Sequence, residues 1–335
     1  MNFQEVSRMP GGTHVDIGLN GAFMTRRYDD PENWVQIVKS LGFDNLSFDS
    51  DALDPFFSGD MQYILEVAKR TGKIAKEKGL GISDYFTGYA SYRFFGLAHR
   101  EEPQRRRMLT WMEDAIKLAA AMGAKGMGGR CDAYSVETLN NPVVREKRYH
   151  GVIDAYRTIA RQAKALGLSA VYFEQMYVPS LIPHTIKETY DFIRDANKDL
   201  DGVPVRPVVD VGHCCGGAYG LTGEDMLYEK WIERFGAACN LIHIQQTKRI
   251  SSDHMAFSSG YRGDIEIERI IESLSNSVKR AGSEPWAEHL APSKNIVLVL
   301  EVLPSTKETE EAIYDQLAQS NAYLRRAIPK GGIDL

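Results

Sequence analysis

The sequence predicts an α/β protein folded as a single (β/α)8 barrel. Short runs rich in Val and Ile alternate with longer segments whose apolar residues recur every three or four positions, a pattern typical of strand–helix units. About eight such units fill the 335 residues without a linker or low-complexity segment, which favours one domain. A doubly wound open sheet is the alternative, but Gly18-Leu19-Asn20-Gly21 after the first strand is not the Gly-rich turn of that fold.

Eight segments have the composition of strands. Some of them, such as 296–302, are apolar at consecutive positions, which indicates a strand buried on both faces and therefore a parallel sheet. In chain order, the predicted strands are 14–19, 45–49, 81–86, 126–130, 170–175, 206–211, 240–245 and 296–302.

The connecting segments have the spacing of amphipathic helices, about 3.6 residues. Apolar stripes run through 34–41, 61–75, 109–119, 149–163, 267–278 and 313–324. Asp30 followed by Pro31 is typical of a helix start. Gly42, Gly81 and Gly167 each follow a leucine where a helix is predicted to end.

Composition and charge exclude several classes of protein. The chain has 40 Lys and Arg residues against 45 Asp and Glu residues and a formal charge of −5, so it lacks the basic surface that a nucleic-acid partner needs. No apolar run approaches the length of about 18 residues that crosses a membrane, and the first residues do not resemble a signal peptide. The four cysteines include no C-x-x-C pair and are predicted to be reduced thiols. We therefore expect a soluble cytoplasmic protein.

Polar side chains end four successive predicted strands, at the face where barrel enzymes carry their active sites. They are Glu174, Asp210, His243 and Glu301, each after an apolar run. Any one of these acids could instead cap a helix or pair with an arginine. Three carboxylates and an imidazole at one barrel mouth, however, would be unstable without a cation between them. The set predicts a shared divalent metal, with Mn²⁺ favoured and Co²⁺, Mg²⁺ or Zn²⁺ as alternatives, because no thiolate is present.

The strand-end residues resemble a known family. Glu174, the run Asp210-Val211-Gly212-His213, His243 and Glu301 resemble the xylose isomerase-like TIM-barrel superfamily of sugar and sugar-phosphate isomerases and epimerases, over about residues 14–328. The resemblance implies that Glu174, Asp210, His243 and Glu301 are metal ligands and that His213 contacts the substrate. A histidine that only orients Asp210 or the metal is the alternative for His213.

The resemblance also implies acid–base chemistry for Glu174 and Glu301 on a ketose substrate. A divalent cation bound to the carbonyl and the neighbouring hydroxyl of a ketose acidifies the α-proton and stabilises the resulting enediolate. Epimerisation needs one base on each face of that planar intermediate, and two glutamates across the mouth can remove the proton on one face and return it on the other. Asp210 and His243 would then be ligands only. The symmetric pair favours an epimerase or racemase over an aldose–ketose isomerase.

A narrower resemblance concerns the seventh predicted strand. The run I-H-I-Q-Q-T at 242–247, followed by Ser252-Asp253-His254, resembles the tetrulose-phosphate (erythrulose-phosphate) isomerases and racemases of tetritol catabolism. Gln246 departs from the wider superfamily, where an Asp is typical at this position. The resemblance implies inversion at C3 of a tetrulose phosphate and a substrate contact from His254.

A phosphorylated substrate needs cationic groups near the mouth. Arg249 is the best candidate, because its loop directly follows the seventh strand. The other candidates are Lys248, Arg26, Arg27, Arg130 and Arg262, and for each a solvated surface position is the alternative. We expect the segment 248–263 to act as a lid and residues 1–12 to form an N-terminal extension. The glycine run at 126–129 lies within a strand and predicts close backbone packing instead of a phosphate loop.

Other functions remain open at this point. Within the same superfamily, the alternatives are a free-ketose 3-epimerase, an aldose–ketose isomerase or an inosose-type dehydratase. A DNA-repair endonuclease would need further His and Glu ligands and a basic surface, and a non-catalytic barrel would have lost one of the two glutamates. Relatives of this barrel are often dimers or tetramers, so a homo-oligomer is expected.

Overall fold

The structure confirms the predicted barrel. It is a computed structural model that describes residues 12–92 and 96–335, so the predicted N-terminal extension lies outside the described residues except for Gly12. Eight parallel strands follow one another around the barrel in chain order, and pairing of β10 with β1 closes it. These strands are β1 (His14–Asn20), β2 (Asn45–Asp49), β3 (Gly81–Phe86), β4 (Gly126–Arg130), β6 (Ala170–Glu174), β8 (Val205–Asp210), β9 (Leu241–Ile244) and β10 (Asn295–Leu300).

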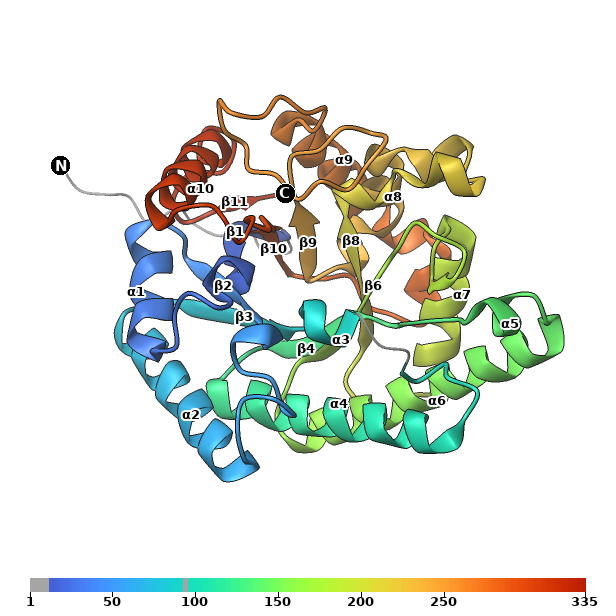
Figure 1. Cartoon of the computed structure of the whole chain (residues 1–335). Coiled ribbons are helices and arrows are strands. Elements are labelled where there is room, and N and C mark those ends of the chain that lie inside the picture. Colours follow the sequence, from blue (N-terminus) through green and yellow to red (C-terminus); the bar gives the residue numbers. More distant parts are fainter. Residues whose placement is uncertain (1–11, 93–95) are drawn as a thin grey trace.

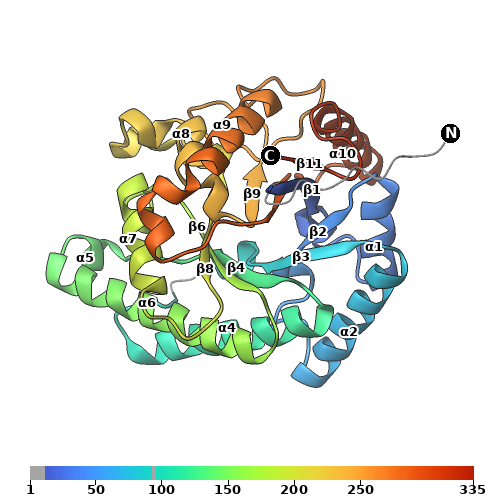
Figure 2. The ribbon, with the colours of Figure 1, turned by 180° about the vertical axis from the view of Figure 1, so that it is seen from behind.

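Helices cover the outside of the barrel, as the two opposite views in Figures 1 and 2 show. They are α1 (Pro31–Ser40), α2 (Met61–Glu77), α4 (Glu102–Met122), α6 (Pro142–Ala165), α7 (Ile186–Asn197), α8 (Tyr228–Phe235), α9 (Ile267–Arg280) and α10 (Glu310–Leu324), with the short α3 (Tyr89–Tyr92) and α5 (Val136–Leu139). Among the described residues, no helix is both long and apolar enough to cross a membrane. Three short strands lie outside the barrel order: β5 (Asp132–Ala133) pairs with β7 (Leu181–Ile182), and β11 (Ile333–Asp334) pairs with β1.

The helix ends show how local sequence sets the boundaries. The carboxylate of Asp30 accepts a hydrogen bond from the first turn of α1, as its position before Pro31 predicts. Gly42 and Gly167 adopt left-handed conformations after α1 and α6, at φ +83° and +80°. The predicted stop at Gly81 is wrong, because Gly79 makes the left-handed turn after α2 at φ +63° and Gly81 already belongs to β3.

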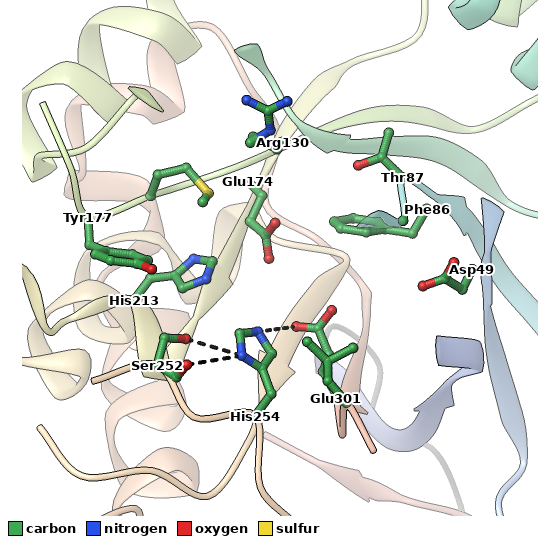
Figure 3. A pocket seen from close by; sticks show the side chains of 13 residues that line it. Asp49, Phe86, Thr87, Arg130, Glu174, Tyr177, His213, Ser252, His254 and Glu301 are labelled. Atoms are coloured by element: carbon green, nitrogen blue, oxygen red, sulfur yellow. Dashed lines mark hydrogen bonds and ion pairs between the residues drawn. The ribbon is translucent and has the colours of Figure 1, made fainter. Parts of the chain in front are cut away.

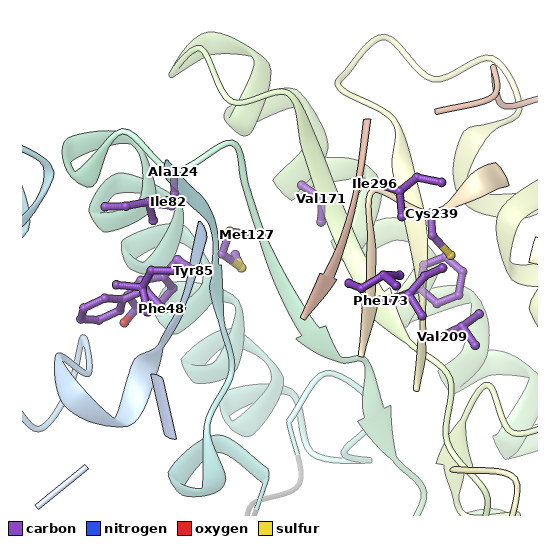
Figure 4. Packing of buried hydrophobic residues seen from close by; sticks show 14 of the residues in the cluster. Phe48, Ile82, Tyr85, Ala124, Met127, Val171, Phe173, Val209, Cys239 and Ile296 are labelled. Atoms are coloured by element: carbon purple, nitrogen blue, oxygen red, sulfur yellow. The ribbon is translucent and has the colours of Figure 1, made fainter. Parts of the chain in front are cut away.

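The barrel interior is apolar directly below its mouth. Successive side chains of a strand alternate between the interior and the helices, so residues two positions apart share a face. The residues two positions before the polar strand ends are therefore also interior, and they are Tyr172, Val208, Leu241 and Val299. All four are buried in one cluster, which forms an apolar floor below the polar residues. A larger cluster fills the layer between strands and helices, and Figure 4 shows part of it.

The glycine run of β4 gives space to Tyr172. A Cβ atom on Gly128 would lie 2.2 Å from the backbone oxygen of Tyr172, and one on Gly126 would lie 2.5 Å from its ring. Gly129 has φ +149° and leaves room for Thr87, whose Oγ1 would lie 1.8 Å from an added Cβ. These close approaches confirm the predicted role of the run in backbone packing.

Candidate metal centre and substrate pocket

The structure brings the four predicted ligands together at the mouth of the barrel. Glu174 ends β6, Asp210 ends β8, His243 lies in β9, and Glu301 directly follows β10. Each offers one ligand atom, and these atoms all lie within 4.8 Å of one another. The pairing of β8 with β9 places Asp210 opposite His243, so strand register sets the level of both side chains. A group of three buried oxygen donors and one imidazole can hold a divalent cation.

His243 lies between the two glutamates. Its Nδ1 is 3.0 Å from Glu174 Oε1 and 3.2 Å from Glu301 Oε2. Neither ring nitrogen of His243 has a hydrogen-bond partner among the described residues, nor has Glu174 Oε1, although all three atoms are buried. Burial opposes the protonated imidazole, but the charges of Glu301 and Glu174 prevail and raise the pKa of His243 well above its usual value. Electrostatically, the cluster therefore favours a positive charge at its centre.

Asp210 is fixed by two glutamines. The side-chain amide of Gln175 donates to the Asp210 backbone oxygen and accepts from the Asp210 backbone N–H, at 3.0 and 2.8 Å. Gln245 Nε2 donates to both carboxylate oxygens of Asp210, at 2.9 and 3.0 Å. Gly212 makes room for this contact, because a Cβ atom there would lie 2.3 Å from the Gln245 side chain. Burial raises the pKa of Asp210, which a nearby cation would reverse.

His254 faces the same cluster from the loop after β9. Its backbone N–H donates to Gln245 Oε1 at 2.6 Å, and its backbone oxygen accepts from Leu303 N–H at 3.1 Å. Held in a left-handed conformation at φ +51°, it places Nε2 3.5 Å from Glu301 Oε2 and 4.0 Å from Asp210 Oδ2. Burial opposes its charge, but Glu301 raises the pKa of His254 to about 9.

His213 reaches the cluster from the other side of Asp210. Its Nδ1 lies 2.7 Å from the backbone oxygen of Gln175, which can only accept, so Nδ1 carries the proton. The other ring nitrogen, Nε2, lies 3.8 Å from Asp210 Oδ2. The Tyr177 ring packs against the His213 ring at 5.2 Å between centroids. This orientation leaves Nε2 available to a ligand in the pocket.

A cavity of about 170 Å³ lies over the cluster. Figure 3 shows His213 and His254 facing the space between Glu174 and Glu301. Its lining combines the polar cluster with apolar groups: Asp49, Phe86, Thr87, Gly88, Arg130, Glu174, Met176, Tyr177, His213, Ser252, His254, Glu301 and Leu303. Phe86 packs against the His243 ring at 4.5 Å between centroids. Its size and mixed lining suit a small polar substrate.

The structure separates the predicted phosphate-binding residues. Arg249 forms an ion pair with Glu229, and its guanidinium lies 5.2 Å from the centre of the Tyr228 ring. Of the described residues that line the cavity, Arg130 is the one arginine, so the predicted substrate contact of Arg249 has no support in this arrangement. Arg27 is also occupied, because it donates to backbone oxygens and to Glu310.

The loop after β9 is anchored at both ends by Gln246. Its carboxamide accepts from Ile265 N–H and donates to the Ile265 backbone oxygen, both at 3.0 Å. Gln246 therefore holds the two ends of the loop together and does not line the cavity. The proposed lid function of 248–263 stays a prediction.

Sequence reasoning missed several residues of the site, and Asp49 and Gln245 are the most informative. Asp49 ends β2 and lines the cavity. It could have been predicted, because it is a polar residue at the end of a predicted strand, as are the four predicted ligands. Gln245 is buried two positions after His243, and nothing in the sequence indicates that its amide contacts Asp210.

The comparisons with known proteins agree with this fold. Residues 35–303 match the protein family described as the xylose isomerase-like TIM barrel. A D-erythrulose 1-phosphate 3-epimerase from Brucella abortus (strain 2308) is 22% identical over 328 residues, which cover 96% of this chain and 99% of that protein. A Rhodospirillum rubrum structure provisionally described as a xylose isomerase has a TM-score of 0.82 at 23% identity, over 94% of this chain and 100% of the other. A D-psicose 3-epimerase from Clostridium cellulolyticum H10, solved with D-tagatose, has a TM-score of 0.64 at 15% identity, over 92% and 99% of the two chains.

Fold and site together define a (β/α)8 barrel with an acid–imidazole cluster at the carboxyl ends of its strands. The chain belongs to the xylose isomerase-like TIM barrel family. Two of these three relatives are named as epimerases. Epimerases are isomerases, so the predicted enzyme class is confirmed.

Proposed function

We propose that this protein is a divalent-metal-dependent epimerase or racemase that inverts C3 of a ketose phosphate, with erythrulose phosphate as the best candidate. One observation carries the proposal: carboxylates from two different strands, Glu174 and Glu301, lie 3.0 and 3.2 Å from the same nitrogen of His243. The curated relative that is named for C3 of erythrulose 1-phosphate supports this substrate class. We further expect a cytoplasmic homo-oligomer.

The four predicted ligands fit a divalent metal. The unpartnered buried atoms of Glu174 and His243 are donors that a cation would satisfy, and the group contains no thiolate. Mn²⁺ is therefore the first choice, and Co²⁺, Mg²⁺ and Zn²⁺ are alternatives. When bound by Glu174, Asp210, His243 and Glu301, such a cation would polarise the ketone of the substrate and stabilise negative charge on its oxygens.

The proton transfers are assigned to the two glutamates. The charge of His243 keeps the pKa of Glu301 well below its usual value despite burial, and a cation bound to His243 in place of that proton would act in the same direction, so this group is an ionised base. Ionised Glu301 removes the C3 proton of one epimer, and Glu174, which carries a proton at that stage, delivers it to the opposite face. Proton exchange of both carboxyl groups with solvent then restores the starting state. For the other epimer, Glu174 is the ionised base and Glu301 carries the proton. Protonated His254 and the free nitrogen of His213 hydrogen-bond the substrate oxygens, and Phe86 limits access of water.

The proposed function predicts exchange of the C3 proton with solvent. With Mn²⁺ and either D-erythrulose 1-phosphate or D-erythrulose 4-phosphate in D₂O, the protein should incorporate deuterium at C3 and form the L epimer, as followed by NMR and polarimetry. Faster turnover of unphosphorylated ketoses would favour the free-ketose 3-epimerase, and formation of an aldose would favour the isomerase. Absence of exchange with every tetrulose and pentulose phosphate would contradict the proposal.

Arg130 is the residue we expect to bind the phosphate. It ends β4 beside Glu174, lines the cavity, and donates to the Ser91 backbone oxygen at 3.0 Å. Because charge-assisted hydrogen bonds to charged groups contribute about 1.5–3 kcal/mol, Arg130→Leu should lower kcat/KM for the phosphorylated substrate by about 10–100-fold. The free ketose should lose less than about threefold. Arg249→Leu is the matched control. If it lowered kcat/KM for the phosphorylated substrate more than Arg130→Leu does, Arg249 would be the phosphate-binding residue instead.

A further inference from the structure

Asp49 is a buried carboxyl group in the cavity that the proton transfers do not use. It ends β2, is 6% exposed, and lines the cavity together with Glu174 and Glu301. In Figure 3 its carboxyl group points toward the centre of the cavity, beyond Phe86. A carboxyl group loses its hydration when it is buried, so it is stable there only if it finds a partner.

The position of this carboxyl group is fixed on one side. Its Oδ1 accepts from the Asp51 backbone N–H at 2.8 Å, and this is its single hydrogen bond among the described residues. The backbone after β3 passes close by, because a Cβ atom on Gly88 would lie 2.4 Å from the same oxygen. Oδ1 is therefore enclosed by protein. The second oxygen, Oδ2, remains for a group inside the cavity.

Asp49 also lies apart from the basic groups of the cavity. In the barrel order, β2 and β8 are separated by three strands in either direction, so Asp49 stands opposite His213. Arg130 ends β4, two strands away, and His254 follows β9. The phosphate is assigned to Arg130, and a carboxyl group such as that of Asp49 is not a phosphate ligand. We expect the other end of a short ketose phosphate, which carries a hydroxyl group, to lie at the β2 side of the cavity.

We propose that Asp49 is a specificity-determining residue that hydrogen-bonds the terminal hydroxyl group at the unphosphorylated end of the substrate. This inference rests on the proposed function and deepens it. Burial, together with the charges of Asp51 and Glu301, raises the pKa of Asp49 to about 8. A protonated carboxyl group offers one donor and one acceptor, which match the acceptor and donor of a hydroxyl group. Phe86 and Leu303 line the same cavity, and their apolar side chains cannot form a hydrogen bond with the hydroxyl group.

The test compares two substrates and two variants. D-erythrulose 1-phosphate has a C4 hydroxyl group, and its 4-deoxy analogue lacks it. Asp49→Leu should lower kcat/KM for D-erythrulose 1-phosphate by about 10–100-fold, because a buried hydrogen bond is lost. The wild-type protein should lose a similar factor on the 4-deoxy analogue, and Asp49→Leu should change the rate with that analogue by less than about threefold. Asp49→Asn, which keeps a donor and an acceptor of the same size, should retain most of the activity with the hydroxylated substrate.

Controls separate this role from a merely structural one. Asp44→Asn removes an acid that precedes β2 at the opposite end of the barrel and pairs with Arg325, and it should leave the ratio of the two substrates unchanged. Mn²⁺ affinity and the thermal midpoint show whether Asp49→Leu preserves the site. Equal losses on both substrates, or no loss on either, would overturn the inference while leaving the C3 chemistry intact. If the wild-type protein exchanges no C3 proton of any tetrulose phosphate, the proposed function fails and this inference fails with it.

Discussion

Replacing either Glu174 or Glu301 with glutamine is expected to lower kcat for C3 inversion by at least about 10³-fold, within the range that general acid–base catalysis contributes. Glutamine keeps an oxygen at each position but cannot accept and return a proton. Both carboxylates lie close to the same nitrogen of His243, so their surroundings are similar. Under the proposed mechanism, each variant removes the base from one face of the substrate. The loss should therefore be similar in size for the two variants.

Isotope exchange separates two bases from one. In D₂O, Glu174→Gln should still exchange the C3 proton of one epimer of the ketose phosphate, and Glu301→Gln should exchange that of the other, because each variant retains one base. Neither variant should interconvert the epimers. Glu266→Gln is a matched control, since Glu266 is an exposed glutamate paired with Arg269. If one variant epimerised within tenfold of the wild-type rate, the assignment of two glutamate bases would be wrong.

Removal of the divalent metal is the second change expected to have a large effect. Exhaustive chelation should reduce turnover by at least about 10³-fold, because the charge that develops on the substrate oxygens would lose its counter-ion. Addition of Mn²⁺ should restore it. A metal present at about 1,000 times its Kd stabilises the folded state by roughly 4 kcal/mol, so the thermal midpoint should fall by several degrees on chelation.

A ligand variant provides an independent test. Asp210→Asn should weaken Mn²⁺ binding, measured by titration calorimetry, because the buried carboxylate is the donor lost. Asp44→Asn is the matched control, since Asp44 precedes β2 at the opposite end of the barrel and pairs with Arg325. Full activity after chelation, or unchanged Mn²⁺ affinity in Asp210→Asn, would contradict the metal centre.

The polar residues at the strand ends could be predicted, because the local sequence of each strand determines which of its side chains share a face. A run such as V-Y-F-E has only one arrangement in a buried parallel strand, with Tyr172 and Glu174 on the same face, and the closure of the barrel brings such ends together. Two helices, α7 and α8, were not predicted although their buried residues recur at helical spacing. In α8 these residues are Tyr228, Trp231, Ile232 and Phe235. The stripe is short, because α7 has 12 residues and α8 has 8, and in α7 it includes the polar Thr189.

The loops could not be predicted, because their side chains are positioned by partners far away in sequence. Nothing in the sequence near Arg249 indicates its ion pair with Glu229, because Glu229 lies on α8, which was not predicted. His254 reaches the cluster only through its left-handed backbone and two hydrogen bonds to residues after β9 and β10. The resemblance to known sequences indicated His254, whereas its orientation required the structure.

The carboxamide of Gln245 connects the loop after β9 to the carboxylate of Asp210, one of the proposed metal ligands. One end of this side chain binds the Asp210 carboxylate, and the other binds the backbone of His254. Any ion that favours the present position of Asp210 also favours the present position of the loop. By reciprocity, whatever factor the ion contributes to ordering the loop, the ordered loop contributes to the affinity for the ion. With the proposed cation bound, a change that releases the loop from Gln245 would therefore also weaken the binding of the cation.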